Sequence, residues 1–510
     1  MQESWGTVPE TAFDIDIAKI LFNLADKPLI TDSTLIDENT WHDLDMDDIF
    51  FLLNRATTPL GAQYLFYLLK HPVFSKDELN RRENLIDHFS KNQTLRENVQ
   101  LSMRHLAEKN AKYLPYSLWK PLPDKPMYAK FLPFLSLLSI VTLAAVLFQI
   151  APISFLLPIF IVNLVIHTTI KRKIEPFIHS FRYLGIFIGA AHRIVKLKDT
   201  QLNGINETLK SHLKHIDVIA KKMYTLQLKD ETGLLEYVKI YFLADVTGFY
   251  AAVDAIAERV NELRETYKIL GYLDALISIA SFRVEYPHFC HPNFSENTTD
   301  FIVEEIYNPL LEEPVENTFS FDAKNIIITG SNMAGKTTFL KTMGVNAIFA
   351  QTMNVCMAKS YTAPFIKVIS SIGRSDNLIF GKSYYLAEVE SILRLLTASE
   401  TPAIHLFIVD EIFRGTNSVE RLAASIEVLK YLANEKDFIL VATHDLQLSE
   451  ILKKDYHNFH FRENVCNDGL TFDYKLHPGR STTRNAIALL EYVGYPASIV
   501  ENAKKRLENK

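Results

Sequence analysis

The longest apolar stretch of the chain runs from residue 131 to residue 170 and contains no Asp, Glu, Lys or Arg. As a single helix it would extend for roughly 60 Å, about twice the ~30 Å hydrocarbon core of a bilayer. Polar residues and a proline between residues 149 and 154 interrupt it. The pattern therefore predicts two apolar helices, Phe131–Phe148 and Phe155–Ile170, joined by a hinge.

The charges that flank these helices predict their orientation in a membrane. Lys130 precedes the first helix, the run Lys171-Arg172-Lys173 follows the second, and the hinge carries no charge. By the positive-inside rule we expect a multi-pass membrane protein with both large flanks cytoplasmic, in the inner or plasma membrane if the source is bacterial. A hairpin buried inside a soluble domain is the alternative, although core helices seldom run this long without a charge.

The segment after the apolar pair has the periodicity of long packed helices. Between residues 253 and 270, apolar side chains recur at alternating spacings of three and four, which places them on one helix face. An intramolecular lever and a coiled-coil partner both fit this pattern. Residues 171–222 carry eleven Lys or Arg against four Asp or Glu. This basic segment can bind DNA phosphates, bind anionic lipid headgroups, or form a helix face that contacts only solvent.

The last third of the chain changes to short, continuous apolar runs that predict buried strands. These runs are Asn325–Thr329, Leu406–Val409 and Phe438–Thr443, and the residues that follow the first can continue as a helix. We therefore expect a multidomain fold, helical at first with the transmembrane hairpin inserted, and then an α/β domain.

A phosphate-binding loop follows the first of these strands. Gly330–Thr337 fits the pattern G-x-x-x-x-G-K-[ST]. Backbone N–H groups of such a loop, together with the positive end of the next helix, form a nest for phosphates. Lys336 would reach the β- and γ-phosphates of ATP, and the Thr337 hydroxyl would ligate Mg²⁺. The residues expected to bind ATP are Gly330, Ser331, Asn332, Met333, Ala334, Gly335, Lys336, Thr337 and Thr338.

The other two strands end in residues suited to ATP hydrolysis. Asp410 and Glu411 follow the second strand, where the aspartate can hold Mg²⁺ with Thr337 and the glutamate can polarise the attacking water. His444 follows the third strand, at a sheet edge where it can sense the γ-phosphate. Taken together and in this order, these residues predict that the α/β domain is a P-loop ATPase domain of the ABC type, which hydrolyses ATP to ADP and phosphate.

These motifs resemble those of the MutS-type ATPases of DNA mismatch repair. Gly330–Thr337 resembles the family's G-P-N-M-G-G-K-[ST], and Asp410–Asn417 resembles its D-E-I-G-R-G-T-S. Ser375–Glu388 resembles its D-D-L and G-R-S-T-F-x-x-E segments, and Leu476–Ser481 resembles its Y-K-L-x-P-G-x-S stretch. The resemblance implies a homodimer in which Ser383 of one protomer contacts the γ-phosphate held by the other. The implied catalytic residues are Glu411, Lys336, Ser383 and His444.

Among the positions that depart from the family pattern, four concern the nucleotide site. Ser331 replaces a proline, while Ala334 and Phe413 each replace a glycine. None of these changes removes a phosphate or metal contact, although Phe413 places a bulky ring beside the carboxylates of Asp410 and Glu411. Val315 lies near where some members carry an aromatic side chain that stacks on adenine, so recognition of the base is less well defined than recognition of the phosphates.

The helical part also resembles the family, in its core domain. Leu53–Gly61 is similar to an L-N-x-T-x-T-P-x-G stretch, and Leu270–Leu276 to the return from lever to core, L-x-x-L-D-x-L. Mismatch-reading members carry an N-terminal domain whose F-x-E element wedges a phenylalanine at the mispair. Residues 1–49 precede the core here and contain no F-x-E, so we expect a member that lacks this domain and does not read mismatches directly.

Composition adds few constraints. The formal net charge of −6 gives no global basic field that would point to nucleic acid. The three cysteines are isolated, which fits a reducing compartment and argues against a zinc site or a disulfide framework. Residues 1–18 lack a basic start followed by an apolar run, so we expect no signal peptide.

The leading hypothesis is a membrane-tethered MutS-like ATPase whose nucleotide state drives dimerisation and moves helical levers against DNA or a membrane partner. The alternative is an ABC-type ATPase that drives a membrane process without nucleic acid. Two spanning helices cannot form a transport path alone, and an L-S-G-G-Q-like signature is absent. The expected domains are an acidic segment (1–49), a first core part (50–129), the hairpin (130–171), the lever and second core part (172–300), and the ATPase (301–510).

Overall fold

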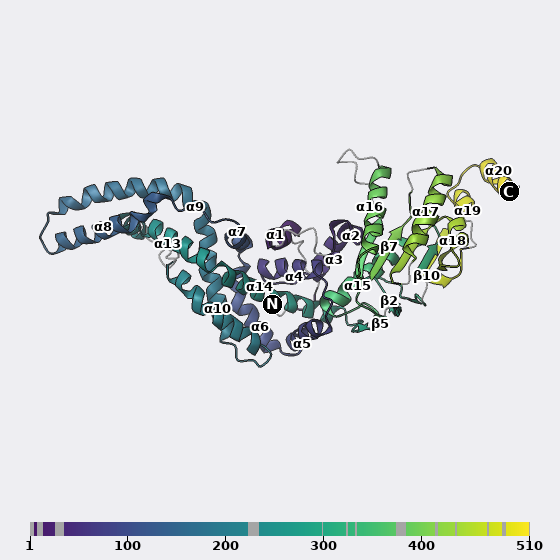
Figure 1. The fold of residues 1–510 in the computed structure, drawn as a ribbon, viewed down its shortest axis with the longest axis horizontal. Coiled ribbons are helices and arrows are strands. Elements are labelled where there is room, and N and C mark those ends of the chain that lie inside the picture. Colours follow the sequence, from purple (N-terminus) through teal and green to yellow (C-terminus); the bar gives the residue numbers. More distant parts are fainter. Residues whose placement is uncertain are drawn as a thin grey trace. The chain divides into compact units, whose positions relative to one another are not determined.

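The computed structural model of the 510-residue chain contains two compact units. It describes residues 5–7, 14–25, 35–222, 234–297, 299–322, 325–331, 334–373, 384–413, 417–433, 436–466, 469–481 and 486–508. Unit 1 comprises Met1–Thr31, Leu53–Tyr67 and Asn84–Val284, and unit 2 comprises Asp32–Leu52, Leu68–Glu83 and Glu285–Lys510. Each unit is therefore assembled from segments that are far apart in the sequence, shown by the colours of Figure 1.

Helices make up the described part of unit 1 and also the segments of unit 2 that precede residue 84. Before the apolar pair these are α1 (Ile15–Ala25), α2 (Glu38–Asp43), α3 (Met46–Leu53), α4 (Pro59–Lys70), α5 (Lys76–Lys91), α6 (Gln93–Met103) and α7 (Leu114–Trp119). From the apolar pair onwards they are α8 (Leu132–Leu147), α9 (Leu156–Val195), α10 (Asn203–Lys222), α12 (Leu234–Phe242), α13 (Ala244–Glu258) and α14 (Val260–Glu285).

The two core motifs found in the sequence meet inside unit 1. The backbone N–H groups of Thr57 and Thr58 donate to the Asp274 carboxylate at 3.0 and 2.8 Å, and the Thr58 hydroxyl donates to it at 2.7 Å. Asp274 of α14 thereby takes up N–H groups at the start of α4, which otherwise lack partners at a helix N-terminus. A Cβ on Gly61 would lie 2.3 Å from Asp274 Oδ2, so only glycine permits this approach.

The apolar pair forms an extended helical hairpin. Figure 1 shows α8 and α9 running antiparallel and joined at their far ends. Met127–Leu147 and Ile153–Ile174 are both long and apolar enough to cross a membrane, and α9 continues beyond the second stretch to Val195. The predicted pair of apolar helices is therefore confirmed. Within the described chain the hairpin is not buried, because most of its large side chains are exposed, as Leu147 and Ile153 illustrate (72% and 76%).

Unit 2 contains two sheets. The smaller sheet has the strand order β1-β5-β2-β3 and the larger has the order β10-β9-β4-β8-β7-β6. The strands of the smaller sheet are β1 (Asn293–Phe294), β2 (Ile302–Ile306), β3 (Asn317–Ser320) and β5 (Ser360–Ala363). Those of the larger are β4 (Asn325–Thr329), β6 (Lys367–Ile372), β7 (His405–Asp410), β8 (Phe438–Thr443), β9 (Tyr456–Cys466) and β10 (Gly469–Pro478). The helices of unit 2 after β4 are α15 (Lys336–Met353), α16 (Tyr384–Ser399), α17 (Ser418–Leu432), α18 (Leu446–Ile451), α19 (Ala486–Tyr492) and α20 (Ala497–Glu508).

The three predicted strands lie next to one another in the larger sheet. They are β4, β8 and β7, all parallel and buried along their whole length. Thr329 is in register with Thr443, and Asp410 with Ala442. Because the strands are parallel and in register, their carboxyl ends lie together at one edge of the sheet. This edge holds the loop after β4, the carboxylates at the end of β7 and the histidine after β8.

Candidate nucleotide-binding site

The loop between β4 and α15 has the geometry of a phosphate cradle. Gly330 and Gly335 have φ values of 142° and 99°, which favour glycine. Lys336, the first residue of α15, is almost fully buried, and its Nζ donates to the carbonyl oxygens of Gly330 and Ser331 at 2.6 and 2.8 Å. The lysine therefore lies across the mouth of the loop, where a phosphate would replace these carbonyl oxygens as its partner.

The two predicted metal ligands are in contact. The Thr337 hydroxyl donates to Asp410 Oδ2 at 2.6 Å, from the start of α15 to the end of β7. Asp410 is 6% exposed. A hydroxyl and a carboxylate are oxygen ligands of the kind Mg²⁺ prefers, and it completes its shell with water and phosphate oxygens. The donor set therefore fits Mg²⁺ at this edge of the sheet.

Glu411 and His444 form a pair at the same edge. His444 Nδ1 lies 2.9 Å from Glu411 Oε2, and the Glu411 N–H donates to the Ala442 carbonyl oxygen at 2.9 Å. Glu411 has a φ of 57°, an uncommon backbone conformation that turns its side chain out of the strand direction. The Glu411 carboxylate is mostly buried while the imidazole of His444 is half exposed. The ring thus fixes the orientation of the carboxylate.

Phe413 occupies a position where a glycine conformation is used. Its φ is 58°, a left-handed conformation that favours glycine, which is the residue at this position of the D-E-I-G-R-G-T-S motif. The ring, which the sequence led us to expect beside the carboxylates of Asp410 and Glu411, packs into the hydrophobic core. It is 7% exposed and belongs to the hydrophobic cluster that includes Val409 and Leu429. Burial of this ring offsets the cost of the left-handed backbone, about 1–2 kcal/mol.

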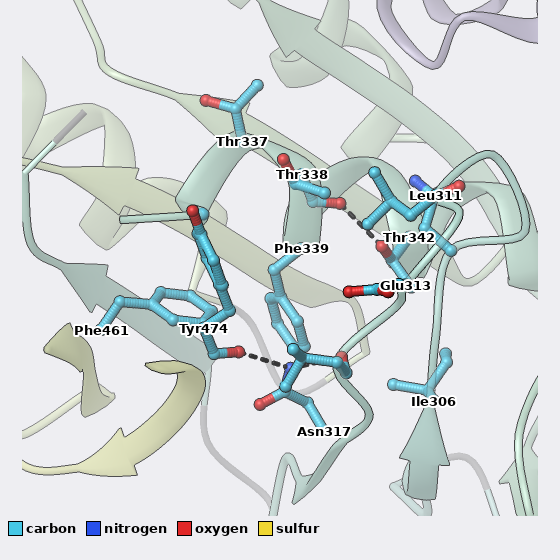
Figure 2. A pocket seen from close by; sticks show the side chains of 13 residues that line it. Ile306, Leu311, Glu313, Asn317, Thr337, Thr338, Phe339, Thr342, Phe461 and Tyr474 are labelled. Carbon is cyan, nitrogen blue, oxygen red and sulfur yellow. Dashed lines mark hydrogen bonds between the residues drawn. The ribbon is translucent and has the colours of Figure 1, made fainter. Parts of the chain in front are cut away.

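A cavity of about 430 Å³ lies beside the phosphate loop. Figure 2 shows the rings of Phe339, Phe461 and Tyr474 next to one another along it, close to Thr337 and Thr338. Its other lining residues are Ile306, Asn308, Leu311, Glu313, Val315, Asn317, Gly335 and Thr342. Its position and its aromatic lining suit a flat, apolar ring system attached to a phosphate chain.

Tyr474 is the functional candidate that the sequence did not reveal. It lies in β10 where the register shifts between Phe472 and Leu476, and it has a φ of 51°. Asn317 holds this bulge from both sides, donating to the Tyr474 carbonyl oxygen at 3.1 Å and accepting from the Leu476 N–H at 2.7 Å. Tyr474 opens the Y-K-L segment of the resembling motif, but nothing local shows that this segment folds back onto the loop.

Some predicted site residues lie outside the described part of the chain. These are Asn332 and Met333 of the phosphate loop and Ser383 of the segment before α16. The described site therefore comprises Gly330, Ser331, Ala334, Gly335, Lys336, Thr337, Thr338, Asp410, Glu411 and His444. The structure brings these residues together around one sheet edge, with Ala334 buried and its N–H donating to Ser331 O at 3.2 Å.

Comparison with known proteins places this site in a family. Residues 326–509 match the family model MutS domain V. Proteins named DNA mismatch repair protein MutS are 25% identical over 302 residues in Natronomonas pharaonis (56% of this chain, 34% of the relative) and 28% identical over 263 residues in Thermus thermophilus (51% and 32%). That of Aquifex pyrophilus is 28% identical over 265 residues (50% and 30%). The chain spans about a third of the length of these curated relatives. By its domain V and by these relatives, the chain belongs to the MutS-type family.

Proposed function

We propose that this protein is a MutS-like ATPase that binds ATP with Mg²⁺ at the edge formed by β4, β7 and β8 and hydrolyses it. The observation that carries the proposal is the 2.6 Å contact between Thr337 and Asp410 directly beside the buried amine of Lys336. A hydroxyl, a carboxylate and an ammonium group converge where a phosphate loop ends. This combination serves phosphoryl transfer by positioning and by neutralising charge.

Each residue of the site has a distinct role in this proposal. Thr337 and Asp410 would hold Mg²⁺, which supplies neutralisation of the phosphate charge. Lys336 would exchange its loop carbonyl partners for β- and γ-phosphate oxygens. Glu411 accepts a proton from, or orients, the attacking water, and His444 keeps the carboxylate aimed by its 2.9 Å contact.

The adenine base is proposed to enter the aromatic cavity. Tyr474 lies across from Gly335, with its ring 3.2 Å from where a Cβ on that glycine would be, so the ring stands directly over the phosphate loop. Val315, the position at which the sequence suggested weak base recognition, also lines the cavity but offers no ring. Tyr474 and Phe461 therefore replace the missing aromatic as candidates for stacking.

Two substitutions test the chemistry. The Lys336→Ala variant loses the phosphate partner and should lose tight ATP binding, whereas Glu411→Gln keeps the shape of the site and should bind ATP while stalling hydrolysis by about 10²-fold or more. Fluorescent-nucleotide titration and phosphate release separate binding from turnover. Lys430→Ala, at an exposed lysine of α17, serves as the control for the loss of a positive charge and should match the wild type. Wild-type turnover by Glu411→Gln would refute the assigned role of the glutamate.

Homodimerisation, DNA and the membrane complete the proposal. The relatives are named for DNA mismatch repair, and from this we infer that the protein binds DNA. The homodimer follows from the resemblance of the segment around Ser383, and binding without mismatch reading from the lack of an F-x-E element in residues 1–49. The exposed apolar hairpin supports a membrane tether through residues 131–170, with both flanks cytoplasmic. The nucleotide state of unit 2 would then control how the helices of unit 1 engage their partner.

The exposed hairpin also favours a second candidate, an ATPase that drives a membrane process without nucleic acid. The ATPase rate of the purified protein discriminates between the two. Stimulation by duplex or branched DNA supports the first proposal, and stimulation by anionic vesicles alone supports the second. The vesicle arm should use phosphatidylglycerol, with phosphatidylcholine vesicles as the uncharged control.

A further inference from the structure

A helix that the sequence did not single out packs against the apolar hairpin. α12 contacts both α8 and α9, and it ends at Phe242, directly before Leu243, whose φ is 50°. There the chain bends by 65° into α13. On the outer side of α12, Tyr237 and Val238 are 61% and 49% exposed, like the apolar side chains of the hairpin itself. The exposed apolar surface of unit 1 therefore extends over three helices.

The broken backbone between α12 and α13 is satisfied by side chains of the hairpin. Asn163 Nδ2 donates to the Tyr241 carbonyl oxygen and Ser136 Oγ donates to the Phe242 carbonyl oxygen, both at 2.6 Å. The last carbonyl groups of a helix have no partner within the helix, and at a surface water normally takes them. Here the donors come instead from two helices that are otherwise apolar, and Asn163 is only 2% exposed.

These contacts lie at the middle of the apolar stretches. Ser136 is the tenth residue of Met127–Leu147, and Asn163 is the eleventh residue of Ile153–Ile174. In a hairpin that crosses a bilayer, both donors would lie near its midplane. Irregular backbone at that depth is tolerated only where protein satisfies its polar groups, which these two side chains do.

The chain approaches the break and leaves it again at the same end of the hairpin. Glu236, in the first turn of α12, pairs with Lys171, three residues before the end of the second apolar stretch at Ile174. After the break, Phe249 of α13 stacks on Phe181 of α9 with ring centroids 5.0 Å apart, which is beyond that end. The segment thus runs from the charged end of the hairpin to its middle and back.

A buried pair of opposite charges flanks the break. Lys239 and Asp245 are 8% and 6% exposed, and Lys239 Nζ lies 3.6 Å from Asp245 Oδ1. An isolated charge near the middle of a bilayer is costly, and such residues face the protein interior and pair with one another. Lys239 and Asp245 meet this requirement, because they are buried in the protein and pair with each other across the bend.

We propose that α12 and the start of α13 form a re-entrant element that inserts into the lipid bilayer together with the hairpin, down to the level of Ser136 and Asn163. The proposal rests on the proposed membrane function of the hairpin. Because α13 leads within two residues into α14, which carries Asp274, the inserted element is continuous with the helical core of unit 1. Insertion therefore gives the helical core a direct mechanical connection to the membrane.

Thiol accessibility tests the insertion in the full-length protein in proteoliposomes, with the three native cysteines replaced by serine. Tyr237→Cys reports on α12, Val165→Cys on the hairpin, and Lys214→Cys on the water-exposed face of α10. A membrane-impermeant maleimide should label Lys214→Cys fast and the other two at least about tenfold more slowly, until SDS exposes them. Protection at Val165→Cys with fast labelling at Tyr237→Cys would overturn the re-entrant element alone. Fast labelling at both would refute the membrane function of the hairpin.

A second set of variants tests the contacts at the break. Ser136→Ala and Asn163→Leu together leave two carbonyl groups without donors, so labelling of Tyr237→Cys should rise by about tenfold while Val165→Cys stays protected. The matched control is Thr142→Ala, because the Thr142 hydroxyl donates to Leu138 O within its own helix, at 2.8 Å. Unchanged protection of Tyr237→Cys in the double variant would contradict the proposal that these side chains hold α12 at depth.

Discussion

Asp274 joins two segments of unit 1 that are more than two hundred residues apart in the sequence. It is fully buried and accepts from Thr57 and Thr58. Burial, the largest influence, raises the pKa of its carboxyl group, and the hydrogen bonds from Thr58 and Thr57 oppose that rise. Asp274 is therefore a structural residue, because its partners belong to the start of α4. It is also far along the chain from the residues of the nucleotide-binding site.

The first prediction concerns this residue. Asp274→Ala leaves the Thr57 and Thr58 N–H groups buried without an acceptor, at roughly 1–3 kcal/mol for each. We expect the free energy of unfolding of unit 1 to fall by at least that amount in urea titrations in detergent. The control is Glu265→Ala on the same helix, where the glutamate is exposed and pairs with Lys268 three residues away, so its loss should cost less than about 0.5 kcal/mol. Equal stability of the two variants would contradict the proposed cap.

The second prediction concerns Tyr474. Tyr474→Ala removes the ring that we place against the adenine, so the KM for ATP should rise about tenfold, or roughly 1.4 kcal/mol, with little change in kcat. Tyr474→Phe keeps the ring and should behave like the wild type. Steady-state phosphate release over a range of ATP concentrations gives both constants. A fall in kcat at unchanged KM would place Tyr474 at the reacting phosphate and not at the base.

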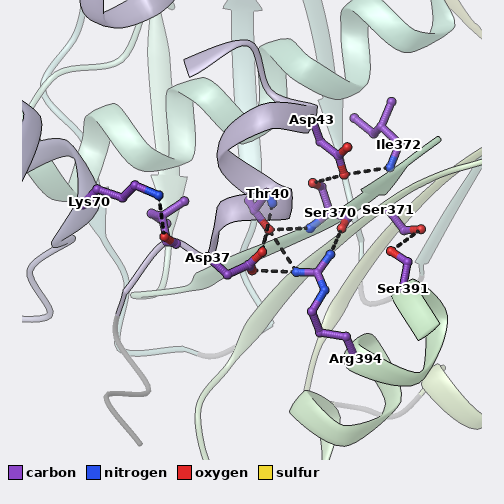
Figure 3. Close-up of polar contacts among 10 residues, drawn as sticks. Asp37, Thr40, Asp43, Lys70, Ser370, Ser371, Ile372, Ser391 and Arg394 are labelled. Carbon is purple, nitrogen blue, oxygen red and sulfur yellow. Dashed lines mark hydrogen bonds and ion pairs between the residues drawn. The ribbon is translucent and has the colours of Figure 1, made fainter. Parts of the chain in front are cut away.

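At the scale of elements, α2 completes the edge of the larger sheet. β6 is the last strand on that side, and an edge strand presents backbone groups that need partners. Figure 3 shows α2 providing them: Thr40 Oγ1 accepts from the Ser370 N–H at 3.1 Å, and Asp43 Oδ2 accepts from the Ile372 N–H at 2.9 Å. Arg394 of α16 joins the same network through Asp37, at 2.6 Å. Part of the acidic N-terminal segment therefore belongs to the ATPase unit.

The third prediction is a pH dependence set by Asp43. Burial, the largest influence, raises the pKa of its carboxyl group above that of the unfolded chain, against hydrogen bonds from Ile372 and Ser370 and the charge of Arg394. The folded state then holds a proton that the unfolded state has lost. The stability of unit 2 should therefore fall as the pH rises from about 4 through the raised pKa, and level off above it.

Asp43→Asn isolates this effect. Its amide oxygen can still accept from the Ile372 N–H and the Ser370 hydroxyl, but it does not titrate, so the part of the slope due to Asp43 should vanish while the fold persists. Urea titrations at several pH values between 4 and 8 measure both slopes. The same slope in Asp43→Asn and wild type would show that Asp43 does not set the pH dependence. Asp43→Ala, which also removes the acceptor, should be roughly 1–3 kcal/mol less stable than Asp43→Asn at every pH.

At the scale of the whole molecule, the homodimer should share its sites. Ser383 is predicted to complete the site of the partner, so Ser383→Ala should bind ATP and lose turnover, while Lys336→Ala should lose binding. In a mixture of the two, one site of each heterodimer combines an intact phosphate loop with an intact serine. Phosphate release should therefore recover in the mixture. No recovery, together with a monomeric mass in ATP and Mg²⁺, would contradict the shared site.

The basic segment of residues 171–222 gives a further prediction at this scale. Arg193 is engaged within the protein, because its guanidinium donates to the Ser102 carbonyl oxygen at 2.9 and 2.6 Å, and burial lowers its pKa. Lys196, Lys198 and Lys214 are exposed. If the segment tracks DNA, neutralising these three lysines should flatten the salt dependence of duplex binding by roughly one unit for each lost phosphate contact.

The same triple variant separates DNA from lipid. If the segment serves the membrane, DNA binding should be unchanged and association with anionic vesicles should weaken by about 1 kcal/mol per charge. Arg193→Lys is the control for a structural arginine and should alter stability more than binding. A tenfold preference for mismatched over matched duplex would contradict the expectation that this chain does not read mismatches.

The sequence by itself determined the features that depend on residues close together in the chain. The buried strands β4, β7 and β8, the phosphate loop and the two apolar helices each follow from runs of adjacent residues, since strand burial, loop glycines and helix hydrophobicity depend on near neighbours. The order of the motifs also indicated the family. Domain boundaries, the shared serine and the membrane crossing remain predictions.

Tertiary structure alone decided which distant segments meet. Asp274 caps α4, Tyr474 reaches the phosphate loop, and α12 ends against Asn163 because hydrogen bonds and close packing join residues that no local pattern connects. Tertiary packing also decided that Phe413, despite its left-handed backbone, buries its ring in the hydrophobic core. Such contacts depend on how whole elements pack, and this is the physical reason that local patterns do not reveal them.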